Sequence, residues 1–215
     1  MKQDAPTTAI MIFARAPVPG QVKTRLIPAL GEKGAAELHA RLLEQTLNTV
    51  TQLENVAIQL YCQPDTQHPL FRRSGDRTTL SLHPQQGNDL GERMSNAFSD
   101  HLPCYPKVLV VGCDCPALTP DDLRAVIEAL DTQDAVIIPA HDGGYVLLGL
   151  KVFSPLIFSD IDWSTERVFE QTIRQLDAAG LQWIALEPKQ DIDRPEDLIH
   201  CPEHLLTGVP DEMAG

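Results

Sequence analysis

The clearest candidates for chemistry are three cations on one short stretch of an acidic chain. Arg15, Lys23 and Arg25 lie within residues 15–25, which contain no acidic side chain, although the protein has a formal net charge of -13. Guanidinium and ammonium groups suit a phosphate group, and Gly20 would let the backbone approach it. The stretch is not a Walker A loop, because Val22 precedes the lysine where that loop has glycine. We predict a phosphate site here, with a solvated basic loop as the alternative.

An aspartate follows the most apolar segment of the chain. Residues 107–112 (KVLVVG) predict a buried strand, and Asp114 comes just past its end. Mg²⁺ in proteins is held by one or two carboxylates together with substrate phosphates, so Asp114 would need a carboxylate partner. Asp191 and Asp193 are the candidates. Because they alternate along an extended segment, we expect only one of them to face the site. The alternative role for Asp193 is to cap the helix expected near residue 195.

The cysteines do not predict zinc or disulfides. The chain has five, an odd number. Cys113 and Cys115 flank Asp114 without the second pair that a zinc ribbon needs. We interpret both as packing residues.

Two further loops carry glycines beside polar groups. Gly87 and Gly91 flank the start of a helix whose free N–H groups could meet a base or a phosphate, although a capped helix explains them equally well. Gly143 and Gly144 follow Asp142 and permit either a close ligand approach or a tight hairpin turn.

Trp163 precedes another expected helix. It could stack on a sugar or fasten that helix to the core, and the second outcome is the commoner one.

The elements that must position these residues alternate between strand and helix. We expect strands at 8–14, 55–62, 78–84, 107–112, 134–140, 144–150 and 181–186, and helices at 31–53, 88–102, 119–130, 164–180 and 194–200. This alternation predicts an α/β fold with a largely parallel sheet and helices on both faces. Ligands collect beyond the carboxyl ends of such strands, so residues 15–25, 84–93, 113–117 and 139–145 could share one cleft. The tail from about residue 203 offers few core candidates and could be frayed.

Bulk composition excludes several classes of partner. The 215 residues suit one sizeable domain, and 43% hydrophobic with 22% charged content is typical of a soluble globular protein. No basic tract favours nucleic acid or an anionic membrane, and no apolar run approaches a membrane span. The N-terminal apolar run is too short for a signal peptide, so we expect a cytoplasmic protein.

Six stretches in this order resemble one family: FARAPVPGQVKTRL, QGNDLGERM, VVGCDCPALT, DGGYVLLGL, DWSTE and DIDRPEDL. They are similar to the DUF2064 family of GT-A-like nucleotide-diphosphosugar transferases, which is similar in fold to the molybdenum-cofactor and phospholactate guanylyltransferases. The resemblance covers about residues 8–200. It implies a single GT-A-like (Rossmann-like) domain spanning 1–215, a three-layer sandwich around a mostly parallel sheet.

The resemblance also implies roles for individual residues. Arg15, Lys23 and Arg25 match the loop that binds the nucleotide's phosphates, the loop that also contains Gly20, and Gln86, Gly87 and Asp89 match a segment near the nucleotide. Asp114 and Asp193 match the metal carboxylates, although Asp-Cys-Pro stands here where many sugar transferases have Asp-x-Asp. Gly143, Gly144, Tyr145, Trp163 and Thr165 would face the acceptor or sugar.

Together these features predict a metal-dependent transferase. Asp114 and Asp193 would hold Mg²⁺ or Mn²⁺, Lys23 would add positive charge, and Asp142 could be the base on an acceptor hydroxyl. We expect sugar transfer from a nucleotide sugar to a small-molecule acceptor. Nucleotidyl transfer from a nucleoside triphosphate is the alternative, and nucleotide or sugar binding without turnover is the second alternative. The sequence predicts no particular base, sugar, acceptor or oligomeric state.

Overall fold

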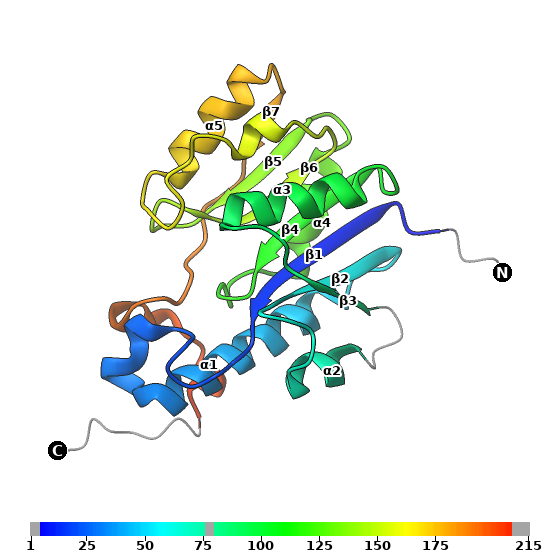
Figure 1. Cartoon of the computed structure of the whole chain (residues 1–215). Helices are drawn as coiled ribbons and strands as arrows, with labels where there is room; N and C mark the ends of the chain where they lie inside the picture. Colours follow the sequence, from blue (N-terminus) through cyan, green and yellow to red (C-terminus); the bar gives the residue numbers. More distant parts are fainter. Residues whose placement is uncertain (1–4, 76–79, 208–215) are drawn as a thin grey trace.

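The computed structural model describes residues 5–75 and 80–207, which form one α/β domain around a seven-stranded sheet (Figure 1). The strand order is β3-β2-β1-β4-β6-β5-β7. The strands are β1 (Thr8–Arg15), β2 (Val56–Gln63), β3 (Leu80–Pro84), β4 (Lys107–Gly112), β5 (Ala135–Pro139), β6 (Tyr145–Leu150) and β7 (Trp183–Ala185).

The sheet is mostly parallel, as predicted. β1 pairs in parallel with β2 and β4, β2 with β3, and β5 with β7, whereas β6 runs antiparallel between β4 and β5. Strands covered on both faces need apolar side chains in both directions, which explains the continuous apolar runs of β1 and β4. The carboxyl ends of the parallel strands and the start of β6 therefore meet at one edge.

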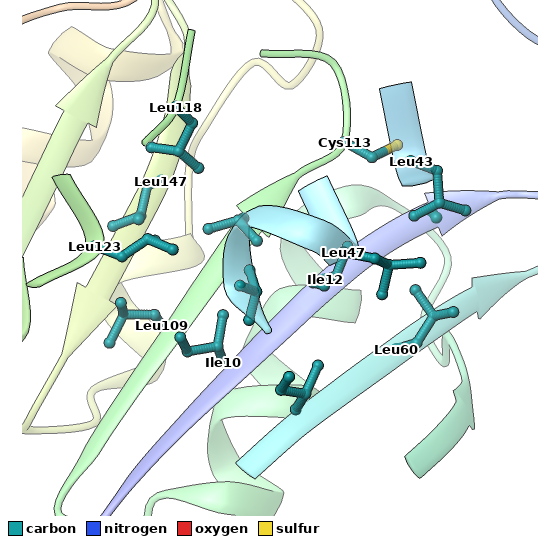
Figure 2. Packing of buried hydrophobic residues seen from close by; sticks show 14 of the residues in the cluster. Ile10, Ile12, Leu43, Leu47, Leu60, Leu109, Cys113, Leu118, Leu123 and Leu147 are labelled. Carbon is teal, nitrogen blue, oxygen red and sulfur yellow. The ribbon is translucent and has the colours of Figure 1, made fainter. Parts of the chain in front are cut away.

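Helices cover both faces of the sheet. They are η1 (Thr24–Leu26), α1 (Ile27–Val50), α2 (Pro69–Gly75), α3 (Leu90–His101), α4 (Pro120–Ala129), η2 (Pro155–Phe158), α5 (Val168–Ala178), η3 (Pro195–His200) and α6 (Glu203–Leu206). On one face Leu47 of α1 and Leu123 of α4 pack with Ile10 and Ile12 (Figure 2). On the other face Phe98 of α3 packs with Met11, in the cluster that also holds residues of α5. The expected three-layer sandwich is confirmed.

Several expected boundaries were wrong for local reasons. The first helix begins at Ile27, and Gly31, at φ 67°, kinks it where its start was expected. The α2 helix was not expected. The helix expected from 164 begins at Val168, because Ser164 has a φ of 66°, outside the helical region.

The C-terminal segment packs back onto α1. Leu205 of α6 is buried against α1, and Arg41 Nη1 donates to the Leu205 carbonyl at 3.0 Å. In Figure 1 this orange-to-red part of the chain leaves β7 and crosses to the start of α1. The expected frayed tail therefore begins with a packed helix, and residues 208–215 lie outside the described part of the chain, as do 78–79 of the predicted third strand.

Across residues 5–75 and 80–207, no helix combines the length and the apolar character that crossing a membrane requires.

Candidate functional site

A cleft of about 1540 Å³ opens along the carboxyl edge of the sheet. Its walls come from the segments after β1, β3, β4 and β5 and from the segment that follows β7. Small-molecule sites are typically about 300–1000 Å³, so this cleft has room for two substrates. The four loops that the sequence predicted to share one cleft all contribute to it.

The centre of the cleft holds one buried cation between two carboxylates. Lys23 Nζ lies 3.3 Å from Asp114 Oδ2 and 3.5 Å from Asp193 Oδ1. The segment carrying Asp193 is tied directly to the loop after β4, because the backbone N–H of Ile192 donates to the Asp114 carbonyl at 2.8 Å. Ile192 itself is fully buried in the cluster with α1. A backbone bond and a core side chain thus bring together residues that are far apart in the sequence.

Charge attraction outweighs burial in this cluster. Burial by itself would lower the pKa of Lys23, but attraction to Asp114 and Asp193 leaves that pKa raised. Burial would likewise raise the pKa of Asp114, yet attraction and a hydrogen bond from Lys23 leave it lowered. Both groups are therefore charged near neutral pH.

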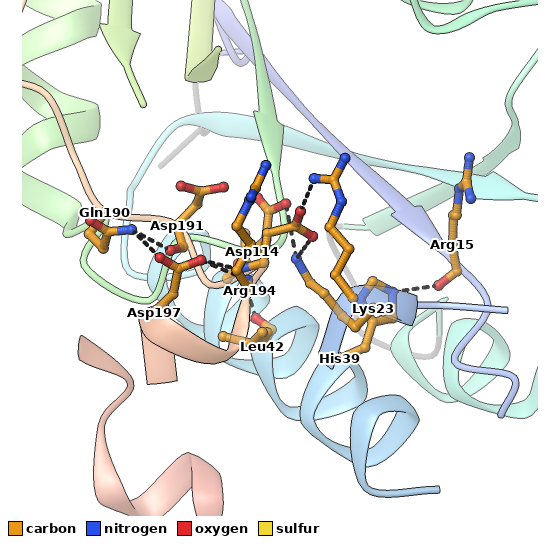
Figure 3. A network of polar contacts seen from close by, with 12 residues as sticks. Arg15, Lys23, His39, Leu42, Asp114, Gln190, Asp191, Arg194 and Asp197 are labelled. Atoms are coloured by element: carbon orange, nitrogen blue, oxygen red, sulfur yellow. Dashed lines mark hydrogen bonds and ion pairs between the residues drawn. The ribbon is translucent and has the colours of Figure 1, made fainter. Parts of the chain in front are cut away.

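The other two cations of the basic loop lie nearer the solvent. Arg25 Nη1 donates to Asp193 Oδ2 at 2.6 Å, and the Arg25 side chain is 54% exposed. Arg15 lines the cleft at the end of β1, and Figure 3 shows it beyond His39 from the carboxylates. Within the described ranges the Arg15 guanidinium has no carboxylate partner, so it is available to an anionic ligand.

His39 is a cleft residue that sequence reasoning missed. It is buried on α1, and its Nε2 lies 3.0 Å from the Arg15 carbonyl, which makes Nε2 the donor. Its Nδ1 is buried, with no hydrogen-bond partner among the residues that the structure describes. Burial lowers the pKa of His39, so it is neutral. On a helix with apolar spacing nothing distinguished it from a core residue.

Asp191 lines the cleft together with Asp193, contrary to expectation. Only one of Asp191 and Asp193 was expected to face the site, but both line the cleft. Positions i and i+2 of an extended segment share a face, and Ile192 between them points into the core. Burial, with repulsion from Asp114 and Asp142, raises the pKa of Asp191 to about 7. Figure 3 shows its carboxyl group beside Asp114.

The opposite wall includes residues 163–167, which belong to the loop from 160 to 167 before α5, and this loop packs on two glycines. A Cβ on Gly91 would lie 2.3 Å from Trp163 Nε1, and a Cβ on Gly143 would lie 2.1 Å from the Glu166 carbonyl oxygen. Gly143 needs its φ of 90° as well. Trp163 therefore fastens this loop to the start of α3 while still lining the cleft.

Asp142 stands on the turn between β5 and β6. Its Oδ1 accepts a hydrogen bond from the Gly144 backbone N–H at 2.9 Å, and the side chain lines the cleft. The hairpin turn that the sequence left open is therefore present.

The cleft brings together most of the predicted site residues. Those that line it are Arg15, Lys23, Arg25, Asp89, Asp114, Asp142, Gly144, Tyr145, Trp163, Thr165 and Asp193. Gly20, Gln86, Gly87 and Gly143 do not line it.

Near the start of α3, the polar contacts differ from those expected. Gln86 lines a separate cavity of about 70 Å³ instead. Its neighbour Gln85 lines the main cleft and donates to the carbonyls of Ala14 and Tyr61, which no sequence signal indicated. Asp89 caps α3 by accepting a hydrogen bond from the Glu92 backbone N–H. This is the capped helix that the sequence offered as the alternative to a ligand-binding helix start.

The two carboxylates of the cleft centre could hold a divalent metal only together with other ligands. Within residues 5–75 and 80–207, no group of three or more His, Cys, Asp or Glu side chains converges to hold an ion. Asp114 and Asp193 do converge on one point, which Lys23 Nζ occupies. Two carboxylates completed by substrate phosphate oxygens suit Mg²⁺ or Mn²⁺, so the pair fits such an ion once that point is vacated. Cys113 and Cys115 are buried with free thiols, as packing residues.

Sequence comparison gives the family. Residues 46–165 match a family described as "Uncharacterized protein conserved in bacteria (DUF2064)". The match covers more than half of the chain, and the protein belongs to this family, as predicted. Among curated proteins, none matches the chain.

Solved structures agree with the fold. The chain is 30% identical to a protein from Desulfovibrio desulfuricans G20 described as a "putative nucleotide-diphospho-sugar transferase", with a TM-score of 0.83 over 90% of this chain and 85% of that one. It also resembles 4-diphosphocytidyl-2C-methyl-D-erythritol synthase from Anaerococcus prevotii DSM 20548 at 14% identity, with a TM-score of 0.61 over 94% and 99%. A cytidylyltransferase from Leptospira borgpetersenii has 14% identity and a TM-score of 0.56 over 90% and 84%. The GT-A-like fold is thereby confirmed, and these structures are described as transferases or synthases of nucleotide-linked compounds, which agrees with the transferase predicted for this chain.

Proposed function

We propose that the protein is a metal-dependent transferase that moves a sugar from a nucleotide sugar to a small-molecule acceptor. One observation carries this proposal: Asp114 and Asp193 converge on a single cation position beside Arg25, in a cleft with room for two substrates. Such a position suits the diphosphate of a nucleotide-linked donor.

The cleft residues have separate roles in the proposed reaction. Asp114 and Asp193 would hold Mg²⁺ or Mn²⁺, which when bound neutralises charge on phosphate oxygens as the leaving group departs. Arg15 and Arg25 add fixed positive charge around the same phosphates. Asp142 takes the proton of the acceptor hydroxyl. The bond from the acceptor oxygen to the anomeric carbon forms, the bond from that carbon to the diphosphate breaks, and the nucleoside diphosphate leaves.

The acceptor lies on the wall opposite the basic loop. Gly144, Tyr145, Trp163 and Thr165 line this side of the cleft. Tyr145 and Trp163 offer aromatic surface for a sugar ring, and Asp142 stands on the turn that leads into Tyr145. The relative that is 30% identical, described as a "putative nucleotide-diphospho-sugar transferase", supports sugar transfer as the first choice.

Nucleotidyl transfer is the second candidate. It is favoured by the cytidylyltransferases of the same fold. In that reaction an acceptor oxygen attacks the α-phosphorus of a nucleoside triphosphate and pyrophosphate leaves. The same carboxylates and cations would serve it, so the products distinguish the two reactions.

A ligand panel followed by product analysis tests the proposal. Melting temperatures are measured with nucleoside triphosphates, nucleoside diphosphates and nucleotide sugars, each with Mn²⁺, Mg²⁺ or excess chelator. A ligand at about a hundred times its dissociation constant adds about 2.7 kcal/mol of stability. We expect stabilisation by a nucleotide sugar that chelator abolishes, and release of a nucleoside diphosphate on turnover. Pyrophosphate release from a triphosphate would establish nucleotidyl transfer instead, and no shift with any nucleotide would contradict both.

A further inference from the structure

The position of Lys23 conflicts with metal binding at the same two carboxylates. Its ammonium lies within 3.5 Å of both Asp114 and Asp193, between the two carboxylates that would hold a shared metal ion. The Lys23 side chain is 6% exposed, whereas the Asp114 and Asp193 side chains are 38% and 29% exposed. Lys23 is thus the innermost of the three groups. An ammonium and a divalent cation at the same two oxygens would repel each other strongly at such short range, so binding of one disfavours the other.

The backbone is built to hold Lys23 there. Lys23 has φ 46° and ψ 42°, the left-handed conformation that costs a residue other than glycine about 1–2 kcal/mol. Buried neighbours on either side, Val22 and Leu26, anchor the turn, and the Leu26 N–H donates to the Lys23 carbonyl at 2.8 Å. The chain therefore maintains an unfavourable backbone conformation that directs this side chain between the carboxylates.

Charge balance gives the consequence. Asp114, Asp193, Lys23 and Arg25 form a contiguous cluster with equal numbers of negative and positive charges. A divalent cation added alone would give these four ion-paired groups a net double positive charge, of which the nearby carboxyl group of Asp191 could offset at most one. A diphosphate added with the metal supplies the missing negative charge and also offers the Lys23 ammonium new oxygen partners.

We propose that Lys23 is an internal counter-cation that keeps a divalent metal out of the Asp114–Asp193 pair until donor phosphates draw its ammonium away. Metal and donor then bind cooperatively, and Lys23 is the residue that couples them. This inference rests on the proposed function, since it concerns the same metal and the same phosphates. It adds the order of events: the carboxylates become metal ligands only when the donor is present.

Metal binding without any nucleotide tests the competition directly. Free Mn²⁺ is titrated by electron paramagnetic resonance against the wild-type protein and against Lys23→Met, which removes the charge with an unbranched side chain only one heavy atom shorter. We expect Lys23→Met to bind Mn²⁺ about tenfold more tightly or better, which is within the usual range of coupling between sites. Equal or weaker Mn²⁺ binding by a folded Lys23→Met would overturn the proposal.

A matched control separates this effect from a change in net charge. Lys33→Met makes the same substitution at an exposed position of α1 that does not line the cleft. It changes net charge by the same amount and is expected to bind Mn²⁺ as the wild type does. An equal gain in Lys33→Met would attribute the effect to long-range charge and would contradict the role of Lys23.

The wild-type protein supplies a measurement that does not depend on the variant folding. Its melting temperature is recorded with Mn²⁺ alone, with each nucleoside diphosphate in chelator, and with both together. The proposal requires the combined shift to exceed the sum of the separate shifts, and additive shifts refute it while leaving the metal–nucleotide site in place. If no diphosphate has any effect, the proposed function fails. The Mn²⁺ titration of Lys23→Met then still tests the competition by itself.

Discussion

Lys23, Asp114 and Asp193 are held by the core, whereas Asp142, Trp163 and Thr165 are held by turns and loops. On the first side a buried Ile192 and a backbone bond to Asp114 fix the carboxylates, and their cation is nearly inaccessible. On the second side the loop from 160 to 167 depends on close contacts with Gly91 and Gly143. The difference indicates that the core fixes the two carboxylates on the proposed phosphate side, whereas the proposed acceptor side depends on local packing contacts.

The largest effect on turnover is expected at Asp114, on the side that the core holds. Asp114→Ala removes a proposed metal ligand and leaves Lys23 with one carboxylate partner. We expect kcat to fall by about 10²–10³, by analogy with the loss of one preorganised electrostatic group. Turnover assays check this, with nucleotide binding measured in parallel by calorimetry. Asp121→Ala on the exposed start of α4 is the control and should keep full activity; unchanged turnover in Asp114→Ala would remove Asp114 from the mechanism.

On the loop-held side of the cleft, a change in packing alone should lower both stability and activity. In Gly91→Ala the new Cβ meets the indole of Trp163, which must move. We expect a loss of about 1–3 kcal/mol in the free energy of unfolding and roughly a 10- to 100-fold fall in kcat/KM for the acceptor, because a small misplacement of a positioning group lowers the rate strongly. Chemical denaturation and steady-state kinetics measure the two effects.

The control for this variant is a glycine with strain but no contact. At Gly180, which has a φ of 69°, an added Cβ would meet no neighbouring side chain or backbone of the described residues within 4 Å. Gly180→Ala is therefore strained without displacing a neighbour. It should lower stability by about 1–2 kcal/mol and leave kcat/KM unchanged. Equal kinetic losses in both variants would mean that the acceptor side responds to stability and not to the position of Trp163.

Asp191 lies between the two sides and should make stability depend on pH. Its pKa in the folded protein, about 7, is above its unfolded value, so the folded state binds the proton more tightly. The stability that proton binding to Asp191 contributes is therefore fully present below about pH 4 and is lost as pH rises through 7.

The variant Asp191→Asn removes this titration. It should be more stable than the wild type at pH 8, by about 1–3 kcal/mol, and the difference should shrink toward pH 4. Urea unfolding in chelator across this range checks the prediction. A difference that does not change with pH would show that Asp191 does not titrate between these values.

The smallest effect on stability is expected at Arg25. Its ion pair with Asp193 is short, but the arginine is 54% exposed, and exposed pairs contribute about 0.2–1 kcal/mol. Arg25→Gln should therefore unfold at nearly the same urea concentration as the wild type, while KM for the donor rises. A large loss of stability in Arg25→Gln would mean that Arg25 supports the fold in the way that the buried charges do.

The sequence by itself determined the sheet, the layers and most of the cleft wall. Strands such as β1 and β4 are covered on both faces, so they must be apolar throughout, and this pattern is readable without the structure. The alternation with helices then brings Arg15 and Asp114 to one edge, because the carboxyl ends of parallel strands coincide there. The helix expected at 119–130 likewise begins where it was predicted, with Thr119 as its cap and Pro120 as its first residue.

Only the tertiary structure decided what lies between the carboxylates. Lys23 is 91 residues from Asp114 and 170 from Asp193 in the sequence, so no local spacing reports their contact. The left-handed backbone conformation of Lys23 also could not be predicted from the sequence, because lysine rarely adopts it and only the surrounding packing enforces it. His39 was missed for the same reason: its environment, and not its type or spacing, makes it a cleft residue. Local sequence encodes local conformation and burial, whereas the partner of each charge depends on how distant segments pack.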